Sequence, residues 1–421
     1  MGVTFIGCTC YPAKAAIAVL AGAIEEHPAL AAVTVRLARN LGELREELPL
    51  ALARGDRTIV AFSFYSPSFP EAVAMLRALR SEHPTGWTAI AGGVHATAET
   101  QAVLDAGFDL VCVGEGERAI LSLLQRALDQ EPLEGAAGFA WRGGRAPKPA
   151  PVALDEFPPF APKTGLYGAI EITRGCIYAC RFCQTPFMSK AKFRHRSVEN
   201  VRHWIRVMVA SGRRDARFIS PTSLSYGSAD ASVNLEAVEA LLAACREELG
   251  PSRRLFFGTF PSEVRPEHVS PEALRVLKKY VDNDNLIIGG QSGSDAVLAE
   301  SRRGHDVEAI VRAARICVEN GFVPNIDFIL GLPGEAEDDM RATLALMEKL
   351  AGMGAKVHGH TFMPLPGTPF REAAPGDVPE DAKTRLDYLA SQGKLYGHWR
   401  AQIATARELA DRRNRAGGGG V

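Results

Sequence analysis

The stretch Cys176-Ile-Tyr-Ala-Cys180-Arg-Phe-Cys183 places three cysteines within eight residues. The remaining cysteines of the chain are scattered: Cys8, Cys10, Cys112, Cys245 and Cys317. One tight cluster in such a chain indicates a metal site and not a disulfide framework. Three thiolates at this spacing can bind three irons of one [4Fe–4S] cluster and leave the fourth iron open to an external ligand. Zinc is the alternative, but structural zinc needs four ligands, and no Cys/His pair follows at zinc-finger spacing.

Apolar strand segments alternate with helical segments on both sides of this cluster, from residue 166 to 372. The pattern predicts strands at 168–173, 217–220, 254–258, 286–290, 325–330 and 356–362, and helices at 198–211, 234–249, 271–280, 307–320 and 335–350. Six such repeats predict a partial (β/α)6 barrel, whose functional groups lie at the carboxyl ends of its strands. The cysteine cluster follows the first of these strands.

The cluster, with Phe182 before its last cysteine, resembles that of the radical SAM superfamily. Three later segments match this family in order: GGQSGSD at 289–295, DFILGLPGE at 327–335 and FMPLPGTP at 362–369. In the family, the open iron binds the amino and carboxylate groups of S-adenosylmethionine (SAM). An electron from the cluster then cleaves SAM to a 5′-deoxyadenosyl radical, while the protein positions the reactants and excludes water.

The resemblance implies that Cys176, Cys180 and Cys183 bind iron. It implies SAM contacts for eight further residues: Phe182, Ser220, Thr222, Gln291, Ser292, Arg303, Ile329 and Gly331. The family usually ends its second strand in Gly-Gly-Glu, which holds the methionine amine, but this chain has Ile-Ser-Pro-Thr-Ser at 219–223. Ser220 or Thr222 is expected to substitute through a hydroxyl or carbonyl. The fifth-strand motif also departs from the family, with Asp327 in place of its first glycine and Glu335 one residue late.

Residues 1–130 contain five further strand–helix units, which predict a doubly wound parallel sheet of the flavodoxin or Rossmann type. Strands are expected at 3–7, 33–37, 58–62, 88–91 and 110–113, and helices at 13–26, 42–53 and 70–81, among others. Four of the strand ends are small, polar or glycine-rich, at 7–12, 63–68, 92–97 and 114–117. Ligands of such sheets lie outside the carboxyl ends of the strands, so we expect a ligand here.

The segments GGVHAT at 92–97 and GEGE at 114–117 resemble the cobalamin-binding domain that precedes many radical SAM domains. This resemblance implies cobalamin contacts for Thr9, Tyr11, Ser63, Tyr65, Ser66, Gly92, Gly93, His95, Glu115 and Gly116. The Asp-x-His-x-x-Gly motif that supplies a histidine to cobalt is absent, so the cobalamin is expected to be base-off. Tyr65 is expected beneath cobalt, and His95 is expected to steady its loop rather than bind the metal.

The other parts of the chain are a hairpin and proline-rich linker at 131–165 and a helical extension at 373–421. The extension is expected to form one long helix or a helical pair at 379–413, with a disordered glycine-rich tail from Arg415. Among the 421 residues, 48 are Lys or Arg and 49 are Asp or Glu, so nucleic acid is a disfavoured partner. No apolar run is long enough to span a bilayer and no signal peptide is recognised, which predicts a cytoplasmic protein.

The leading hypothesis is a cobalamin-dependent radical SAM enzyme, similar to the class B methyltransferases, that methylates an unactivated carbon. Its substrate is expected to be a small molecule or peptide, and its electron donor an external flavodoxin or ferredoxin. The alternatives are a tRNA or protein methylthiotransferase, a radical SAM cyclase or ring-rearranging enzyme, and a non-enzymatic corrinoid or SAM sensor. A methylthiotransferase would hold a second cluster on three N-terminal cysteines, whereas this chain has Cys8, Cys10 and the distant Cys112.

Overall fold

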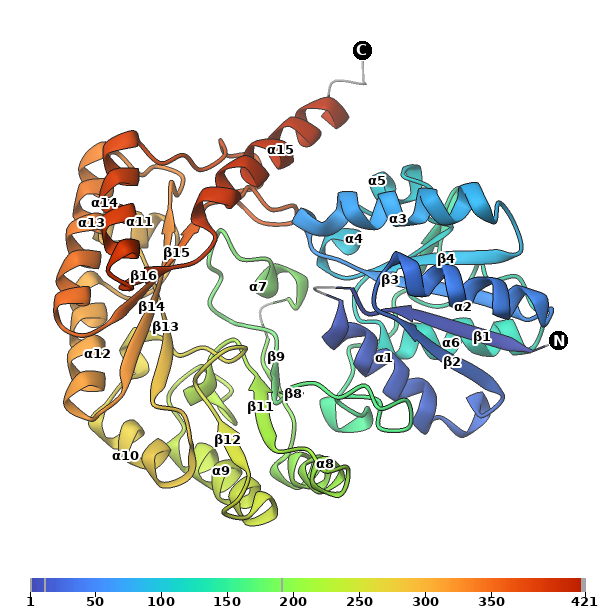
Figure 1. Cartoon of the computed structure of the whole chain (residues 1–421), viewed down its shortest axis with the longest axis horizontal. Helices are drawn as coiled ribbons and strands as arrows, with labels where there is room; N and C mark the ends of the chain where they lie inside the picture. The colour runs from blue at the N-terminus through green and yellow to red at the C-terminus, as the bar shows by residue number, and fades with distance from the viewer. Residues whose placement is uncertain (1, 11–12, 191, 418–421) are drawn as a thin grey trace. The chain divides into compact units, whose positions relative to one another are not determined.

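The computed structural model describes residues 2–10, 13–190 and 192–417. It divides into two compact units, with the boundary between Ile170 and Glu171 (Figure 1). In the described part of the chain, every helix is too short or too polar to cross a membrane. Each unit is described by itself below.

The first unit is a seven-stranded sheet in the order β2-β1-β3-β4-β5-β6-β7 (Figure 1). Its parallel strands are β1 (Val3–Cys8), β2 (Val33–Ala38), β3 (Arg57–Ser63), β4 (Trp87–Gly92) and β5 (Leu110–Cys112). Its helices are α1 (Lys14–Glu26), α2 (Leu41–Ala53), α3 (Phe69–Glu82), α4 (Val94–Ala98), α5 (Thr100–Asp105) and α6 (Glu117–Leu128). The order 2-1-3-4-5 is that of flavodoxin-like folds, which agrees with the fold predicted from the sequence.

Two apolar cores cover the two faces of this sheet. Successive residues of a strand point to opposite faces, so Phe5 packs with Ile17 and Ile120 while Ile6 packs with Leu44 and Leu76. Helices α1 and α6 therefore supply one layer, and α2, α3 and α5 the other.

The segment predicted to be a linker, 131–165, folds as part of the first unit. Its hairpin, β6 (Phe139–Trp141) and β7 (Gly144–Arg145), pairs antiparallel with β5 and extends the sheet. The backbone N–H groups of Lys163 and Thr164 donate to the carboxylate of Glu25 in α1, each at 2.8 Å. These contacts join residues that are far apart in sequence, so they could not be predicted locally. The proline-rich composition by itself indicated a linker.

The second unit is an incomplete barrel built from two parallel sheets (Figure 1). One has the order β12-β11-β8, from β8 (Ile170–Glu171), β11 (Asp215–Ile219) and β12 (Arg254–Phe256). The other has the order β13-β14-β15-β16, from β13 (Asn285–Gln291), β14 (Val323–Leu330), β15 (Lys356–Thr361) and β16 (Leu395–Tyr396). An isolated parallel bridge between Val264 and Ile288 links the chain after β12 to β13. The strands β9 (Thr173–Arg174) and β10 (Arg194–His195) form a separate antiparallel ribbon.

The helices between these strands begin at side-chain caps in most cases, as the sequence indicates. They are α7 (Gln184–Met188), α8 (Val198–Ala210), α9 (Leu235–Leu249), α10 (Pro271–Tyr280), α11 (Asp295–Glu300), α12 (Val307–Glu319) and α13 (Glu337–Gly352). Ser197 caps α8, Asn234 caps α9 and Asp306 caps α12, each by accepting a backbone N–H from three residues ahead. The caps fix where each helix starts and so where each loop can carry functional groups.

The C-terminal extension contains a strand that the sequence analysis missed. Helices α14 (Glu380–Ser391) and α15 (Trp399–Gly417) form the expected pair, but β16 lies between them and pairs parallel with β15. A two-residue strand carries no detectable alternation, so local sequence could not predict it. Helix α15 also continues through Gly417, so the expected disorder from Arg415 is wrong up to that residue. Residues 418–421 lie outside the described part.

Candidate active site

The three clustered cysteines lie on the loop between β9 and α7. Cys180 is buried and Cys176 and Cys183 are half-buried, and all three are free thiols. Burial raises the pKa of Cys176 to about 11 and raises the pKa of Cys183. Gly175 precedes the loop with φ +86°, and a Cβ there would overlap the carbonyl oxygen of Lys192. The chain thus forms a tight loop that brings together three reduced thiols, the donor set that a [4Fe–4S] cluster requires.

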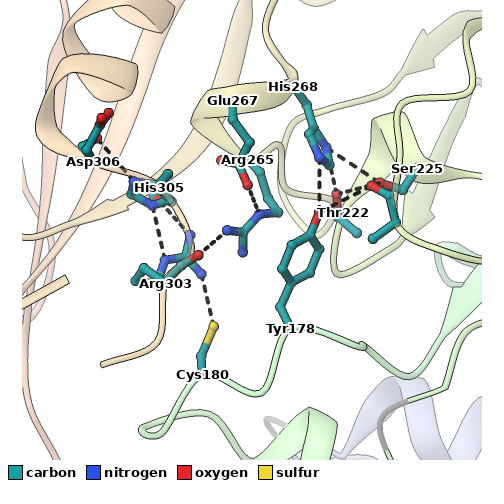
Figure 2. Close-up of polar contacts among 12 residues, drawn as sticks. Tyr178, Cys180, Thr222, Ser225, Arg265, Glu267, His268, Arg303, His305 and Asp306 are labelled. Carbon is teal, nitrogen blue, oxygen red and sulfur yellow. Dashed lines mark hydrogen bonds and ion pairs between the residues drawn. The ribbon is translucent and has the colours of Figure 1, made fainter. Parts of the chain in front are cut away.

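A buried arginine from the loop after α11 contacts this cysteine loop (Figure 2). Arg303 donates from Nη1 to Cys180 Sγ at 3.4 Å and from Nη2 to the carbonyl of Gly289 at 2.6 Å. Burial opposes the charge of Arg303, yet the neighbouring Cys180 raises its pKa above the usual value. Predicted from the sequence as a SAM contact, Arg303 therefore holds a positive charge against the cluster loop.

Tyr178, inside the cysteine loop, joins a second polar network (Figure 2). Its ring lies under the guanidinium of Arg265, with 3.6 Å between Cζ and the ring centroid, and its hydroxyl lies 3.0 Å from Nε2 of His268. Burial lowers the pKa of His268 to about 4, so this imidazole is neutral near pH 7. Thr222 is buried and its hydroxyl lies 3.4 Å from Nδ1 of the same ring. This network fixes the cysteine loop and occupies Thr222, one of the two residues expected at the SAM amine.

Ser220 is the other residue expected there, and its hydroxyl is available. The residue follows directly after β11, is buried, and its Oγ has no hydrogen-bond partner among the described residues. The segment after β12 brings Glu263 beside it, because the Glu263 N–H donates to the Ser220 carbonyl at 3.3 Å. A carboxylate thus stands one strand away from the position where the family motif has its glutamate. Sequence reasoning missed Glu263, which lies in an irregular segment after β12.

Glu263 is an exposed residue, although many protein atoms surround its carboxyl. Its pKa is raised to about 7, first by burial and then by the Asp327 carboxylate, while Arg303 and His358 oppose the shift. The Glu263 charge also raises the pKa of Cys183, although burial is the main cause there. Glu263 therefore lies among the cysteine loop, Arg303 and the inner face of β14 and β15.

Two of the other predicted SAM residues meet at one apolar cluster. Phe182 and Ile329 both pack against Val297, Leu332, Phe362 and Phe370. Beyond Ile329, Gly331 takes φ +71° and donates its N–H to Glu335 Oε2 at 2.6 Å, and a Cβ there would lie 2.7 Å from the backbone nitrogen of Asp377. This arrangement provides an apolar wall ending in a bare backbone turn, which suits a flat adenine ring.

The side chains of Gln291 and Ser292, at the end of β13, have different neighbours. Gln291 takes φ +78° at a bulge, and a Cβ on Gly289 would lie 2.8 Å from its amide nitrogen and 2.9 Å from Arg303 Nη2. Gln291 thus lies beside Arg303. Ser292 is fully buried, 3.3 Å from the hydroxyl of Thr343 in α13, so its side chain serves packing and does not face the cysteine loop.

Five of the residues predicted to bind cobalamin lie at the carboxyl edge of the first sheet: Thr9, Ser63, Tyr65, Gly92 and Gly93. The side chain of Tyr65 is 53% exposed there. Gly93 takes φ +93°, and a Cβ on it would lie 2.9 Å from the carbonyl of Phe64; the nearby Gly114 has open space around it. An edge with an exposed aromatic ring at Tyr65 and open space at Gly114 fits a flat corrin ring. Tyr11 lies outside the described residues.

The four other residues predicted to bind cobalamin, Ser66, His95, Glu115 and Gly116, make contacts within the first unit itself. Ser66 and His95 are buried and bond to each other at 2.9 Å, so they join the loops after β3 and β4, as expected for His95. Glu115 accepts the backbone N–H of Val152 at 2.9 Å. At Gly116 a Cβ would lie 2.9 Å from Leu20 of α1, so the glycine permits helix packing. The side chains of Ser66, His95 and Glu115 therefore hold the edge together rather than projecting from it.

The geometry agrees with a comparison against protein-family models, in which residues 170–347 match the radical SAM superfamily. This segment of the chain is therefore similar to a radical SAM domain. This match spans the cysteine loop, Glu263, Arg303 and β14. The assignment made from the sequence motifs is confirmed at this level.

Curated relatives are tRNA-2-methylthio-N(6)-dimethylallyladenosine synthases. That of Corynebacterium jeikeium is 27% identical over 80% of this chain and 64% of its own length. That of Porphyromonas gingivalis is 31% identical over 54% of this chain and 48% of its own length. The chain thus spans from about half to just under two thirds of these relatives.

Solved structures resemble the chain along most of its length. The radical SAM methyltransferase TsrM of Kitasatospora setae, solved with cobalamin and a [4Fe–4S] cluster, covers 89% of this chain and 75% of its own, with TM-score 0.67 and 16% identity. The cobalamin-dependent radical SAM enzyme OxsB, with aqua-cobalamin, covers 96% of this chain and 56% of its own, with TM-score 0.66 and 15% identity. At such identities the likeness is one of fold.

Proposed function

We propose that this protein is a cobalamin-dependent radical SAM enzyme that methylates an unactivated carbon. The observation that carries the proposal is the buried Arg303 against a loop of three free thiols, at the head of an incomplete barrel that follows a flavodoxin-like unit. The fold likeness to TsrM and OxsB over most of the chain supports it. When bound, the iron–sulfur cluster supplies the electron that cleaves SAM, and cobalamin supplies the methyl group.

The residues of the chain bind and orient SAM. Cys176, Cys180 and Cys183 hold the cluster, and Arg303 places a positive charge beside Cys180. Ser220 and Glu263 take the methionine amine, because one offers an unpartnered hydroxyl and the other a neighbouring carboxylate. A carboxylate and a hydroxyl both accept hydrogen bonds from an ammonium group, so this pair replaces the missing Gly-Gly-Glu.

The apolar wall formed with Phe182 and Ile329 binds adenine and excludes water from the cleaved bond. In the first unit, the edge with Tyr65, Gly92 and Gly93 holds base-off cobalamin, since the described residues supply no histidine after β1 where the usual motif has one. An external flavodoxin or ferredoxin delivers the electron. The substrate is a small molecule or peptide, in keeping with a net charge of −1.

The sequence relatives favour a second candidate, a methylthiotransferase, which would need a second cluster. Cys8 and Cys10 do lie together, with 2.9 Å between their sulfurs. The remaining thiol of this unit, Cys112, is buried within β5, where burial raises its pKa to about 12. Cys112 packs in the core on one face of the sheet, whereas Cys8 and Cys10 pack in the core on the other face, so Cys112 is a poor third ligand. The methyltransferase is therefore the better-supported reading.

Anaerobic reconstitution with iron, sulfide and hydroxocobalamin, followed by desalting and metal analysis, tests the proposal. The expected result is about four cluster irons and about one cobalt per chain, with 5′-deoxyadenosine formed from SAM under reduction. The Cys180→Ala variant should lose the cluster, whereas Cys245→Ala, on the buried face of α9, should retain it. Cluster iron without cobalt contradicts the cobalamin part. About seven or eight irons per chain, with an equal amount of sulfide, favour the methylthiotransferase. Absence of 5′-deoxyadenosine rejects both the methyltransferase and the methylthiotransferase.

A further inference from the structure

A polar cluster lies inside the sheet of the second unit, apart from the cysteine loop. Asp327 in β14 is paired in register with His358 in β15, and His360 lies two residues further along β15 and so on the same face. Asp327 Oδ1 lies 2.9 Å from His358 Nδ1, which lies 3.2 Å from His360 Nε2. All three donor atoms lie within 4.8 Å of one another. Two imidazoles and a carboxylate thus point at one place.

The two contacts of His358 Nδ1 cannot both be ordinary two-centre hydrogen bonds. An imidazole nitrogen carries either one proton or one lone pair. If Nδ1 carries the proton, that proton serves Asp327 and leaves His360 Nε2 without it. If Nδ1 carries the lone pair, it can accept from His360, but it then faces a carboxylate oxygen at 2.9 Å. One positive centre among the three atoms satisfies them together, because it can take a lone pair from each.

We propose that Asp327, His358 and His360 bind a divalent transition-metal ion of the zinc class. Two imidazole nitrogens and one carboxylate oxygen form a donor set that suits zinc or ferrous iron, and calcium and magnesium prefer oxygen ligands alone. Three protein ligands leave at least one coordination position for water or substrate. The ligand nitrogens must be neutral, because only an unprotonated imidazole nitrogen has a lone pair to give.

The C-terminal extension fixes both rings. Tyr396 of β16 stacks on His358, with 4.4 Å between ring centroids and 6° between planes. Gln402 of α15 accepts the backbone N–H of Thr361 through Oε1 at 2.9 Å, so its amide nitrogen faces His360 Nδ1 at 3.3 Å. Metal binding through Nε2 requires the proton on Nδ1, and the Gln402 side chain must then turn its oxygen toward that proton. Such outer partners orient metal-bound histidines and tune their affinity.

The ion would lie close to the groups assigned to SAM chemistry. Gly289, whose carbonyl accepts from Arg303, is the register partner of Asp327 across the β13–β14 pair. Glu263 is within electrostatic range of the same cluster, because Asp327 raises its pKa and His358 lowers it. The open coordination position would therefore hold a substrate that chelates through oxygen or nitrogen. This role rests on the proposed function, whereas metal binding itself does not.

Cobalt(II) titration of the full-length chain tests the proposal without SAM chemistry. The parent carries Cys176→Ala, Cys180→Ala and Cys183→Ala, is washed with EDTA, and is titrated anaerobically with cobalt chloride. The expected result is visible d–d absorption that saturates at about one cobalt per chain and is reversed by zinc. His358→Ala, His360→Ala and Asp327→Asn should each abolish saturation. His203→Ala, which removes an exposed histidine of α8, should leave it unchanged.

Gln402 provides a graded test, because an outer partner alters affinity without supplying a ligand. Gln402→Glu, which offers only acceptors, should bind cobalt more tightly, and Gln402→Leu should bind about 10–100-fold more weakly. Absence of saturable cobalt, or equal binding by the His358→Ala and parent chains, overturns the proposal. Cobalt whose spectrum is dominated by sulfur charge transfer and that survives in both histidine variants would belong to the Cys8–Cys10 pair and also overturns it.

An independent readout uses the wild-type chain with its cluster, in case the triple variant does not fold. Elemental analysis after reconstitution in the presence of zinc should give about one zinc beside about four irons per chain. His360→Gln should lose the zinc and keep the iron. Loss of iron with retained zinc would instead count against the proposed cluster, so the two proposals fail separately. A wild-type chain with iron and no zinc overturns the metal site.

Discussion

Replacing Gly175 by alanine should remove the iron–sulfur cluster, and two costs can be separated. Gly175 has φ +86°, in the left-handed region, where an alanine costs roughly 1–2 kcal/mol. The added Cβ would also lie well under 3.0 Å from the backbone oxygen of Lys192, so the cysteine loop or the chain before β10 must move. That movement displaces Cys176, the next residue, relative to Cys180 and Cys183.

Gly212→Ala is the matched control for the first cost alone. Gly212 has φ +75° at the end of α8, and open space surrounds it. At about 2–4 °C per kcal/mol for a unit of this size, the control should lower the melting transition of the second unit by about 2–8 °C and retain its iron. Gly175→Ala should melt lower still and retain far less iron after reconstitution. Equal melting and equal iron in the two variants would refute the reasoning.

Two further predictions concern buried charges. Arg303→Ala should leave the Gly289 carbonyl unpaired, at a cost of about 1–3 kcal/mol, and should sharply reduce 5′-deoxyadenosine formation. Arg303→Lys should restore part of the stability and little of the activity, because lysine cannot donate to Cys180 and Gly289 from two nitrogens at once. Full activity in Arg303→Lys would contradict the assigned contacts. Burial is the main cause that raises the pKa of Glu335 from 4.5 to about 7. The protonated carboxyl therefore contributes stability that is fully present below about pH 4.5 and is lost as the pH rises through 7. Glu335→Gln should therefore weaken the fall in melting temperature between pH 5 and 8, and an unchanged pH profile would show that Glu335 is not the titrating group.

The features that local sequence predicted are those set by short-range spacing. The cysteine loop, the alternation of strands and helices in the first unit and α10 at Pro271–Tyr280 follow from periodicity and from a motif of eight residues. The role of Thr222 was harder to predict, because its burial against His268 depends on a residue 46 positions away. The pairing of the hairpin at 139–145 with β5 was hard to predict for the same reason, because it joins residues that are far apart in sequence.

Three of the groups that the sequence analysis missed, Asp327, His358 and His360, had a visible signal in the sequence. Asp327 was noted only as a departure from a glycine motif, and the structure turns its carboxylate toward His358. His358 and His360 alternate with Val357, Gly359 and Thr361 in β15, and that spacing alone places both imidazoles on one face of the strand. Glu263 had no such signal, because it lies in an irregular segment whose position depends on bridges to β11 and β13.

The pairing of β16 with β15 also protects the protein against aggregation. The outer edge of β15 is covered by C-terminal residues, since the Val357 N–H donates to Lys394 and the Thr361 N–H donates to Gln402. An uncovered edge strand is a template for pairing with other molecules. Because residues 394–402 are synthesised after both β15 and α14, this edge stays open during synthesis until β16 has emerged. The newly made chain is therefore most vulnerable to misassembly just before its extension folds.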